Sequence, residues 1–230
     1  MKTRPPKFLY RYVDAATAWE CLKEGSLAFV PPRRFNDPFD TNPALDPDPS
    51  EQKARAMLRT RDSFINNVIG VACFTAKKDD PLMWAHYGQK HQGVMISFNA
   101  LHPALISLQR VTYSSKRPSV DATGSNVGNA LLVKSSVWMR EKEWRVTAML
   151  SKCEVKIING APIYVQRLDR KCFVSITFGC CTDNAFIVAV VNALKQWEME
   201  HCLLRRLYLC EKTYSFKARE NTVKDIWQLG

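Results

Sequence analysis

Two glutamates one residue apart, Glu141 and Glu143, are the side chains of this sequence best suited to chemistry. They introduce the stretch EWRVTAML (143–150), whose alternating pattern predicts a strand. Residues two apart on a strand face the same side, so the carboxylates would lie together, which is unfavourable unless a positive group lies over both. Such a pair suits a reaction through a cationic sugar, because a carboxylate binds ribose hydroxyls and stabilises the developing charge. A carboxylate at a strand entrance contributes little to packing, so we expect Glu143→Gln to change stability only slightly.

Three further clusters place polar and aromatic side chains next to predicted strands: YRY (10–12), RFNDPFD (34–40) and MWAHY (83–87). Each also has a simpler structural explanation. Tyr10 and Tyr12 share one face of a strand and would fit a core, whereas Asn36 and Asp37 would fit a turn in which they bond their own backbone. The third cluster would fit a helix with Trp84 packed inward. The residues alone leave both explanations open at each cluster.

The elements that must position these clusters indicate an α+β fold, because strands and helices are grouped irregularly rather than in a βαβ repeat. Apolar and β-branched runs predict strands at 8–13, 26–32, 68–75, 93–98, 109–114, 143–150, 161–168, 172–179, 204–211 and 213–220. Capping residues and helical spacing predict helices at 14–25, 50–67, 79–91, 129–139 and 183–201. Proline-rich residues 42–49 and polar residues 116–128 are typical of loops. No repeat or linker divides the chain, so we expect one domain over 1–230.

The charge of the chain favours anionic partners. Lys and Arg outnumber Asp and Glu by 33 to 22, giving a net charge of +11 that attracts nucleic acid, nucleotides or an acidic protein. No apolar segment has the length of a membrane span or the form of a signal peptide, and the 8 cysteines include no CxxC pair. We therefore expect a cytoplasmic protein with reduced thiols, no membrane partner and no metal site of a common spacing.

Taken in order, the clusters resemble a family of bacterial domains of unknown function that occurs around toxins and phage-defence loci. Its motifs L-Y-[KR]-Y, F-N-D-P-F-D, M-W-A-H-Y and W-x-x-E-x-E-W-R correspond to residues 9–12, 35–40, 83–87 and 138–145. Its strand motif G-V-x-I-x-F corresponds to residues 93–98, so the resemblance extends over most of the chain.

The layout is also similar to that of the ADP-ribosyltransferases, particularly the toxins that modify DNA and RNA. These enzymes carry an Arg or His on a first strand, a G-x-L after a helix, a Ser or Thr at the end of a central strand and a Glu-x-Glu before a later one. Arg11, EGSL (24–27), Thr75 and the Glu141–Glu143 pair occur here in that order. The resemblance implies a split central sheet flanked by helices and NAD as the substrate.

The same resemblance implies roles for individual side chains. Glu143 would bind the nicotinamide ribose and stabilise the transition state, and Glu141 would position or deprotonate the acceptor. Arg11 would hold the diphosphate, and Arg145 or Lys134 would balance the carboxylates. The remaining residues of the NAD-binding set would line the pocket or stack on the rings: Tyr12, Asn36, Asp37, Phe39, Thr75, Trp84, His86 and Tyr87.

These roles describe a bacterial toxin, effector or phage-defence enzyme that modifies nucleic acid, with an immunity or antitoxin protein as a further partner. It would act in the cytoplasm where it is made or in that of a cell into which it is delivered. Two alternatives stay open. One is a metal-dependent nuclease using Asp37, Asp40, Glu141 and Glu143, and the other is a non-catalytic nucleic-acid-binding module.

Overall fold

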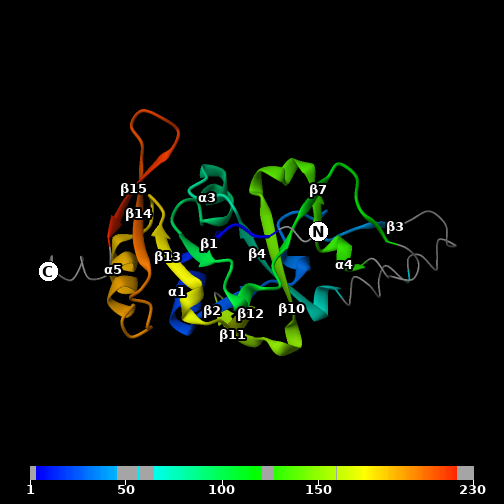
Figure 1. The fold of residues 1–230 in the computed structure, drawn as a ribbon, viewed down its shortest axis with the longest axis horizontal. Helices are drawn as coiled ribbons and strands as arrows, with labels where there is room; N and C mark the ends of the chain where they lie inside the picture. The colour runs from blue at the N-terminus through cyan, green and yellow to red at the C-terminus, as the bar shows by residue number, and fades with distance from the viewer. Residues whose placement is uncertain (1–3, 46–55, 57–64, 121–126, 159, 222–230) are drawn as a thin grey trace.

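The computed structural model describes residues 4–45, 56, 65–120, 127–158 and 160–221 (Figure 1). It has a mixed α+β architecture with a large mixed sheet and few helices, which confirms the fold class expected from the sequence. Most of the helix predicted at 50–67 and part of the loop predicted at 116–128 lie outside the described residues. No helix in the described ranges combines the length and apolar character needed to cross a bilayer.

The helices and strands are short. The helices are α1 (Ala15–Glu24), α3 (Pro81–Tyr87), α4 (Val127–Ala130) and α5 (Asn184–Ala193), with 3₁₀ turns η1 (Pro32–Arg34), η2 (Pro103–Leu105), η3 (Ser136–Glu141), η4 (Leu150–Lys152) and η5 (Arg170–Cys172). The strands are β1 (Phe8–Val13), β2 (Ser26–Phe29), β3 (Ala44–Leu45), β4 (Ile69–Thr75), β5 (Val94–Asn99), β6 (Gln109–Arg110), β7 (Thr112–Ser114), β8 (Ser119–Val120), β9 (Val133–Ser135), β10 (Glu143–Met149), β11 (Glu154–Ile158), β12 (Ala161–Arg167), β13 (Phe173–Phe178), β14 (Leu203–Leu209) and β15 (Phe216–Asn221).

The main sheet has the strand order β15-β14-β13-β5-β1-β4-β10-β6. The β13–β14 pair is parallel and the other neighbours are antiparallel. Between β1 and β4 one register pair is found, Tyr10 with Thr75, whereas β1 pairs with β5 along its whole length and β4 does so with β10. The sheet is therefore weakly joined between its five strands β15-β14-β13-β5-β1 and its three strands β4-β10-β6, and β1 and β4 diverge on either side of that pair. Figure 1 shows α5 beside β13 and β14, near the edge that β15 forms.

Two helices hold the central strands in place. In α1, the Asp14 side chain accepts the backbone N–H of Thr17 at 2.8 Å, and Gly25 ends the helix in the left-handed region at φ 59°. In α3, Asp80 caps the first turn and Pro81 occupies the first helical position. The buried face of α3 packs in a small cluster with Tyr12, Met95 and Leu207, which fixes the residues at its far end over β1.

Several local predictions are wrong, each for a tertiary reason. The helix predicted at 129–139 is replaced by α4, β9 and η3, because β9 pairs in parallel with β7. Helix α5 stops at Ala193 rather than 201, and Trp197 beyond it packs edge-on against Trp19 at 4.6 Å between centroids. Residues 44–45, which were predicted to lie in a loop, form β3 and pair with β8. Strand β11 was not predicted, because its sequence has no recognisable strand pattern, and it forms by pairing with β12.

Gly25→Ala should lower the free energy of unfolding by about 1–2 kcal/mol, because a Cβ at φ 59° is strained and would lie 3.1 Å from Arg170 Cγ. Gly128→Ala is the matched control and should be neutral or slightly stabilising, since no atom of a described residue beyond its chain neighbours and its own helix lies within 4 Å of the added Cβ. Chemical denaturation of the three proteins measures both effects. Equal stability of the two variants would contradict the capping role of Gly25.

Candidate active site

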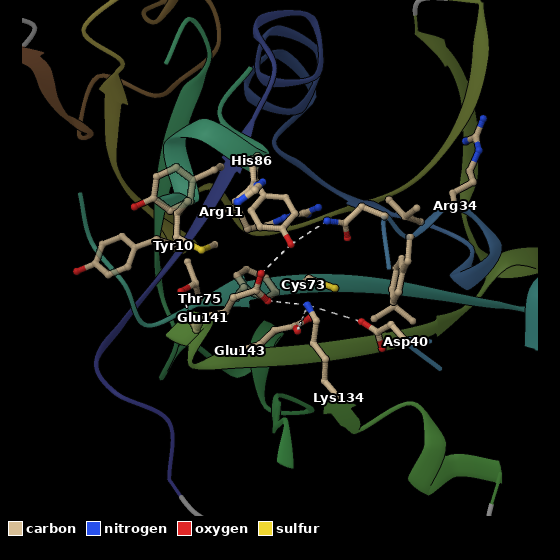
Figure 2. Close-up of a pocket in the computed structure, with 18 residues that line it drawn as sticks. Tyr10, Arg11, Arg34, Asp40, Cys73, Thr75, His86, Lys134, Glu141 and Glu143 are labelled. Carbon is tan, nitrogen blue, oxygen red and sulfur yellow. Dashed lines mark hydrogen bonds and ion pairs between the residues drawn. The ribbon is translucent and has the colours of Figure 1, made fainter. Parts of the chain in front are cut away.

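A cavity of ≈ 310 Å³ lies where β1 and β4 diverge (Figure 2). Strand β1 forms one wall, β4 the floor, and the end of α3 and the turn between η3 and β10 form the other sides. Its lining residues are Tyr10, Arg11, Tyr12, Val30, Arg34, Phe35, Asn36, Asp40, Val71, Cys73, Phe74, Thr75, Met83, His86, Tyr87, Lys134, Glu141 and Glu143. Residues from all four sequence clusters thus meet at one cavity.

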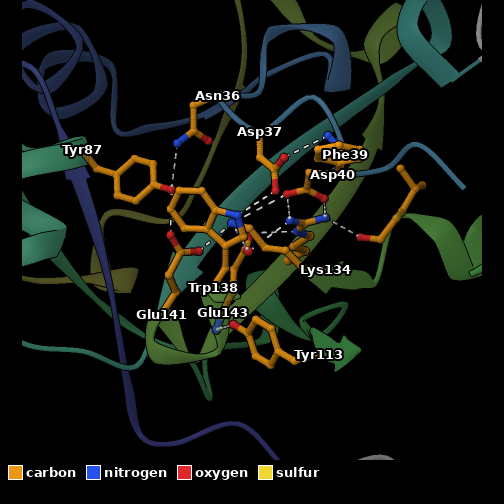
Figure 3. A network of polar contacts seen from close by, with 12 residues as sticks. Asn36, Asp37, Phe39, Asp40, Tyr87, Tyr113, Lys134, Trp138, Glu141 and Glu143 are labelled. Carbon is orange, nitrogen blue, oxygen red and sulfur yellow. Dashed lines mark hydrogen bonds and ion pairs between the residues drawn. The ribbon is translucent and has the colours of Figure 1, made fainter. Parts of the chain in front are cut away.

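A buried network of charged side chains forms one side of this cavity (Figure 3). Arg145 uses all five of its N–H groups: two bind Asp40 at 2.6 and 3.0 Å, two bind Glu143 at 2.7 and 3.0 Å, and one binds the carbonyl of Leu131 at 2.8 Å. Lys134 joins the network to the second glutamate, with Nζ 2.6 Å from Glu141 Oε2 and 3.1 Å from Glu143 Oε2.

The two glutamates are therefore adjacent, although not for the reason that the sequence suggested. Glu141 ends the 3₁₀ turn η3, and Glu143 begins β10. Lys142 between them adopts a left-handed conformation with φ 47° and ψ 52°, so the pair does not lie on one regular strand. The shared cation Lys134 is what lets the two like charges lie close together.

Ionisation of Glu143 is favoured despite its burial. Burial acts to raise the pKa of Glu143, but the charge and hydrogen bonds of Arg145, the charge of Lys134 and a hydrogen bond from Cys73 together hold it below its ordinary value. Burial likewise acts to lower the pKa of Lys134, and the charges of Glu143 and Glu141 raise it overall. The network contains three carboxylates and two cations, which give it a net charge of −1: Asp40, Glu141 and Glu143 with Lys134 and Arg145.

The two glutamates differ in how much hydrogen-bonding capacity is left. Glu143 accepts twice from Arg145 and once from Lys134, so three of the roughly four lone-pair sites of this carboxylate are used, and the Cys73 thiol lies beside it. Glu141 accepts from Lys134 and, at 2.7 Å, from the hydroxyl of Tyr87. Glu141 is thus the carboxylate with the greater capacity left for a ligand.

Arg11 lies on the β1 side of the cavity, across from the glutamates (Figure 2). Its Nη1 donates to the carbonyl of Ala28 at 2.8 Å, and its guanidinium lies over the ring of Phe74 at 5.6 Å. Burial lowers the pKa of Arg11, and within the described ranges no carboxylate is in ion-pair contact with it. A cation without a counter-ion in such a place favours a bound anion.

The cavity is also lined by four other residues of the expected NAD-binding set, Asn36, Thr75, Tyr87 and His86, and the first three form side-chain hydrogen bonds there. The hydroxyl of Thr75 donates to the carbonyl of Glu141 and accepts from the N–H of Lys77 at 2.9 Å. Asn36 lies 3.4 Å from the hydroxyl of Tyr87, and His86 lines the exposed mouth. The expectation that Arg145 or Lys134 balances the carboxylates is confirmed for both.

Some residues of the expected set are not positioned to stack on a ligand. Trp84 is 0% exposed, does not line the cavity, and packs edge-on against Tyr12 at 5.0 Å. Tyr12 does line it, but the ring is buried and the hydroxyl is bonded to Lys77 and Asp80, so the core explanation of this tyrosine is correct. Phe39 is 63% exposed and lies outside the cavity beside Arg117.

Asp37 and Arg145 also support the site from outside it. Asp37 accepts from Trp138 Nε1 at 2.7 Å and from the backbone of Phe39 at 2.9 Å, and it lines a separate hollow. Asp37 was expected to line the NAD pocket, and the structure places it outside the cavity. Arg145, a member of the expected NAD-binding set through its role in balancing the carboxylates, does not line the cavity either. Cys73 and Tyr113 were missed in the sequence. Cys73 lies two residues before Thr75 on β4, a spacing that places both on one face, whereas nothing local indicated that the Tyr113 hydroxyl would accept the N–H of Glu143.

The four acids of the nuclease alternative do not fit a divalent metal. Asp40 and Glu143 are bound by Arg145, Lys134 occupies the space between Glu141 and Glu143, and Asp37 is held by Trp138. An ion would have to displace a cation from this network. Across the described residues, no group of three or more His, Cys, Asp or Glu side chains is arranged to hold a metal.

Comparisons with known proteins give the site no further label. No family model, no curated protein and no solved structure matches the chain.

Arg145→Met should lower the free energy of unfolding by about 3–5 kcal/mol, because it leaves Asp40 and Glu143 buried without their main cation. Arg167→Met removes the same kind of charge from a side chain that is 73% exposed and 3.4 Å from Glu24, and should cost less than about 1 kcal/mol. Urea denaturation at pH 7 compares the two. Equal losses of unfolding free energy in the two variants would contradict the stabilising role of Arg145 in the buried network.

The lowered pKa of Glu143 gives stability a defined dependence on pH. Its ionised form stabilises the folded protein at pH values above its unfolded pKa, near 4.5, and that contribution is lost as the pH falls through the lower folded pKa. Below about pH 4.5 the wild type should lose up to about 1.4 kcal/mol per pH unit more than Glu143→Gln. Parallel curves for the two proteins would contradict the assignment. We now expect the variant to be destabilised at pH 7 as well, in place of the small effect expected from the sequence, since Glu143 is 4% exposed and accepts three hydrogen bonds from Arg145 and Lys134.

Proposed function

We propose that this protein is an NAD-dependent ADP-ribosyltransferase. The observation that carries the proposal is the pairing, in one cavity, of a carboxylate network with net charge −1 and a half-buried Arg11 that has no ion-pair partner among the described residues. A ligand that satisfies both has a cationic group at one end and an anionic group at the other. NAD has this character, with a positively charged nicotinamide ribose and a diphosphate.

The size of the cavity supports the same ligand. Its ≈ 310 Å³ lies at the lower end of the usual range for ligand pockets, roughly 300–1,000 Å³, and suits the nicotinamide ribose half of the dinucleotide. The divergence of β1 and β4 at the Tyr10–Thr75 pair is also what a split central sheet requires, so it supports the transferase-like fold that we propose.

The division of labour that we propose differs from the one implied by the family resemblance. Glu141, with lone pairs to spare, binds the ribose hydroxyls and stabilises the developing oxocarbenium ion. Glu143, bound twice by Arg145 and once by Lys134, holds Lys134 in place and adds its negative field. Arg11 binds the diphosphate through its free N–H groups.

In the transfer, the bond between ribose C1′ and the nicotinamide nitrogen breaks, and its electron pair leaves with nicotinamide. A nitrogen or oxygen of the acceptor forms the new bond to C1′ and loses a proton. We propose that His86, which lines the cavity and is exposed, accepts that proton. The acceptor that we propose is a nucleic acid, and the biological role is that of a bacterial toxin, effector or phage-defence enzyme.

Glu141→Gln should lower kcat/KM for NAD cleavage at least about a hundredfold, because the amide removes the negative charge that faces the developing cation. Glu154→Gln is the control, since that carboxylate is 50% exposed and pairs with Lys156 at 2.7 Å outside the site. Release of nicotinamide from labelled NAD measures both, and melting curves establish that each variant is folded.

The same pair of variants tests the biological role in cells. Expression of the wild type and of Glu154→Gln should arrest bacterial growth, and Glu141→Gln should relieve the arrest. Full NAD cleavage by folded Glu141→Gln, or no NAD cleavage by the wild type with any acceptor, would contradict the proposal.

A further inference from the structure

A second and larger hollow, of ≈ 1050 Å³, lies on the other side of the wall that carries the two glutamates. It is bounded by β6, β7 and the turn between η3 and β10. We call it the basic groove, and its lining residues are Lys77, Leu108, Gln109, Arg110, Val111, Thr112, Tyr113, Leu132, Met139, Arg140 and Lys142.

The charge of the basic groove has one sign. Four of its lining residues, Lys77, Arg110, Arg140 and Lys142, are cationic, and none is acidic. Arg140 lies 3.6 Å from Asp80, but the other three contact no carboxylate within the part of the chain that the structure describes. Elsewhere, cations such as Arg205 are paired with acids, here Asp79 and Glu220. The groove thus concentrates unneutralised positive charge.

The groove and the cavity share a wall through alternate residues. Glu141 and Glu143 line the cavity, while Arg140 and Lys142 line the groove. The left-handed backbone of Lys142 is an uncommon conformation for a residue with a side chain, and it is held by hydrogen bonds to Met139 and Ala76. Lys142 is consequently exposed on the groove side, one residue from each carboxylate.

The groove also offers apolar surface between its cations. Met139 is 60% exposed, and Tyr113 contributes its ring, with the hydroxyl fixed by the N–H of Glu143 at 2.8 Å. Cations that follow a phosphate backbone, interleaved with side chains on which bases pack, are typical of sites for single-stranded nucleic acid. An acidic peptide would use the charges but not the flat apolar surface.

We propose that the basic groove binds the phosphodiester backbone of a single-stranded nucleic acid and presents it to the neighbouring cavity as the acceptor. The presentation step rests on the proposed transferase function, whereas the binding itself does not. The groove therefore determines the class of acceptor, and the cavity determines the chemistry.

The test is direct binding of a fluorescent single-stranded oligonucleotide to the full-length protein without NAD, as a function of salt. The double variant Arg110→Gln, Lys142→Gln should bind at least tenfold more weakly at low salt. Its slope of log affinity against log salt should be shallower by about 1.4, because each lost phosphate contact removes about 0.7 for a single strand.

The matched control is Lys152→Gln, Lys195→Gln, which removes the same charge from exposed side chains outside the groove. It should stay within about twofold of the wild type. An equal loss in both double variants would mean that the overall charge, and not the groove, binds the strand, and would overturn the proposal. Equal competition by polyglutamate of the same charge would also overturn it, in favour of an acidic protein.

Failure of this proposal can be told apart from failure of the transferase proposal. Binding that depends on the groove without any consumption of NAD would support the groove and contradict the enzyme. The opposite result is NAD cleavage and labelling of an acceptor together with oligonucleotide binding that is unchanged in the Arg110→Gln, Lys142→Gln variant. That result would support the transferase proposal and contradict the role of the groove.

Discussion

The side chain of Arg145 is the constraint on which the candidate site depends. Arg145 lies on the buried part of β10 and is 1% exposed, and all of its N–H groups donate to Asp40, Glu143 or the carbonyl of Leu131. These partners belong to three separate segments of the chain, so one guanidinium fixes the loop before β3, the start of β10 and the end of α4 relative to each other. Three carboxylates could not be buried together without Arg145 and Lys134, because an unpaired buried charge costs several kcal/mol.

This network explains why the cavity combines rigidity with an excess of negative charge. Glu143 is held by three hydrogen bonds from Arg145 and Lys134, and it in turn positions Lys134 between the two glutamates. Lys134 then leaves Glu141 oriented by one ion pair and one hydroxyl, with lone pairs directed at the cavity. A fixed negative group costs no reorganisation when positive charge develops in a transition state, which is how preorganised sites accelerate reactions. Arg11 on β1, which has no ion-pair partner among the described residues, supplies positive charge on the opposite side of the same cavity.

Local patterns in the sequence account for much of the frame. Strands β1, β4 and β10 and helices α1 and α3 were predictable, because their apolar runs and capping residues act over a few neighbours. The convergence of YRY, FNDPFD, MWAHY and E-K-E-W-R on one site was also expected. What determines the detail is non-local: β7 draws residues 133–135 into a strand, and the bond between Tyr113 and Glu143 joins residues 30 apart. The secondary-structure propensity of a local segment carries no information about such long-range pairings.

The errors at the site are informative in the same way. Two carboxylates on one strand were expected to be adjacent through the pleat, but they are adjacent through Lys134 and a left-handed Lys142. Trp84 and Tyr12 were assigned to a ligand because aromatic rings serve both cores and binding sites, and only their burial decides between the two. The sequence identified the right residue types, but only the structure shows which of them lie in the core, which hold the cavity residues in place and which line the cavity.

A crystal structure of the protein with a hydrolysis-resistant NAD analogue would test the proposed site most directly. We expect the nicotinamide ribose to lie within hydrogen-bond distance of Glu141 and the diphosphate to lie on Arg11, with the Arg145 network unchanged. An analogue bound away from the cavity between β1 and β4, or one whose ribose contacts Glu143 after Arg145 has been displaced, would contradict it.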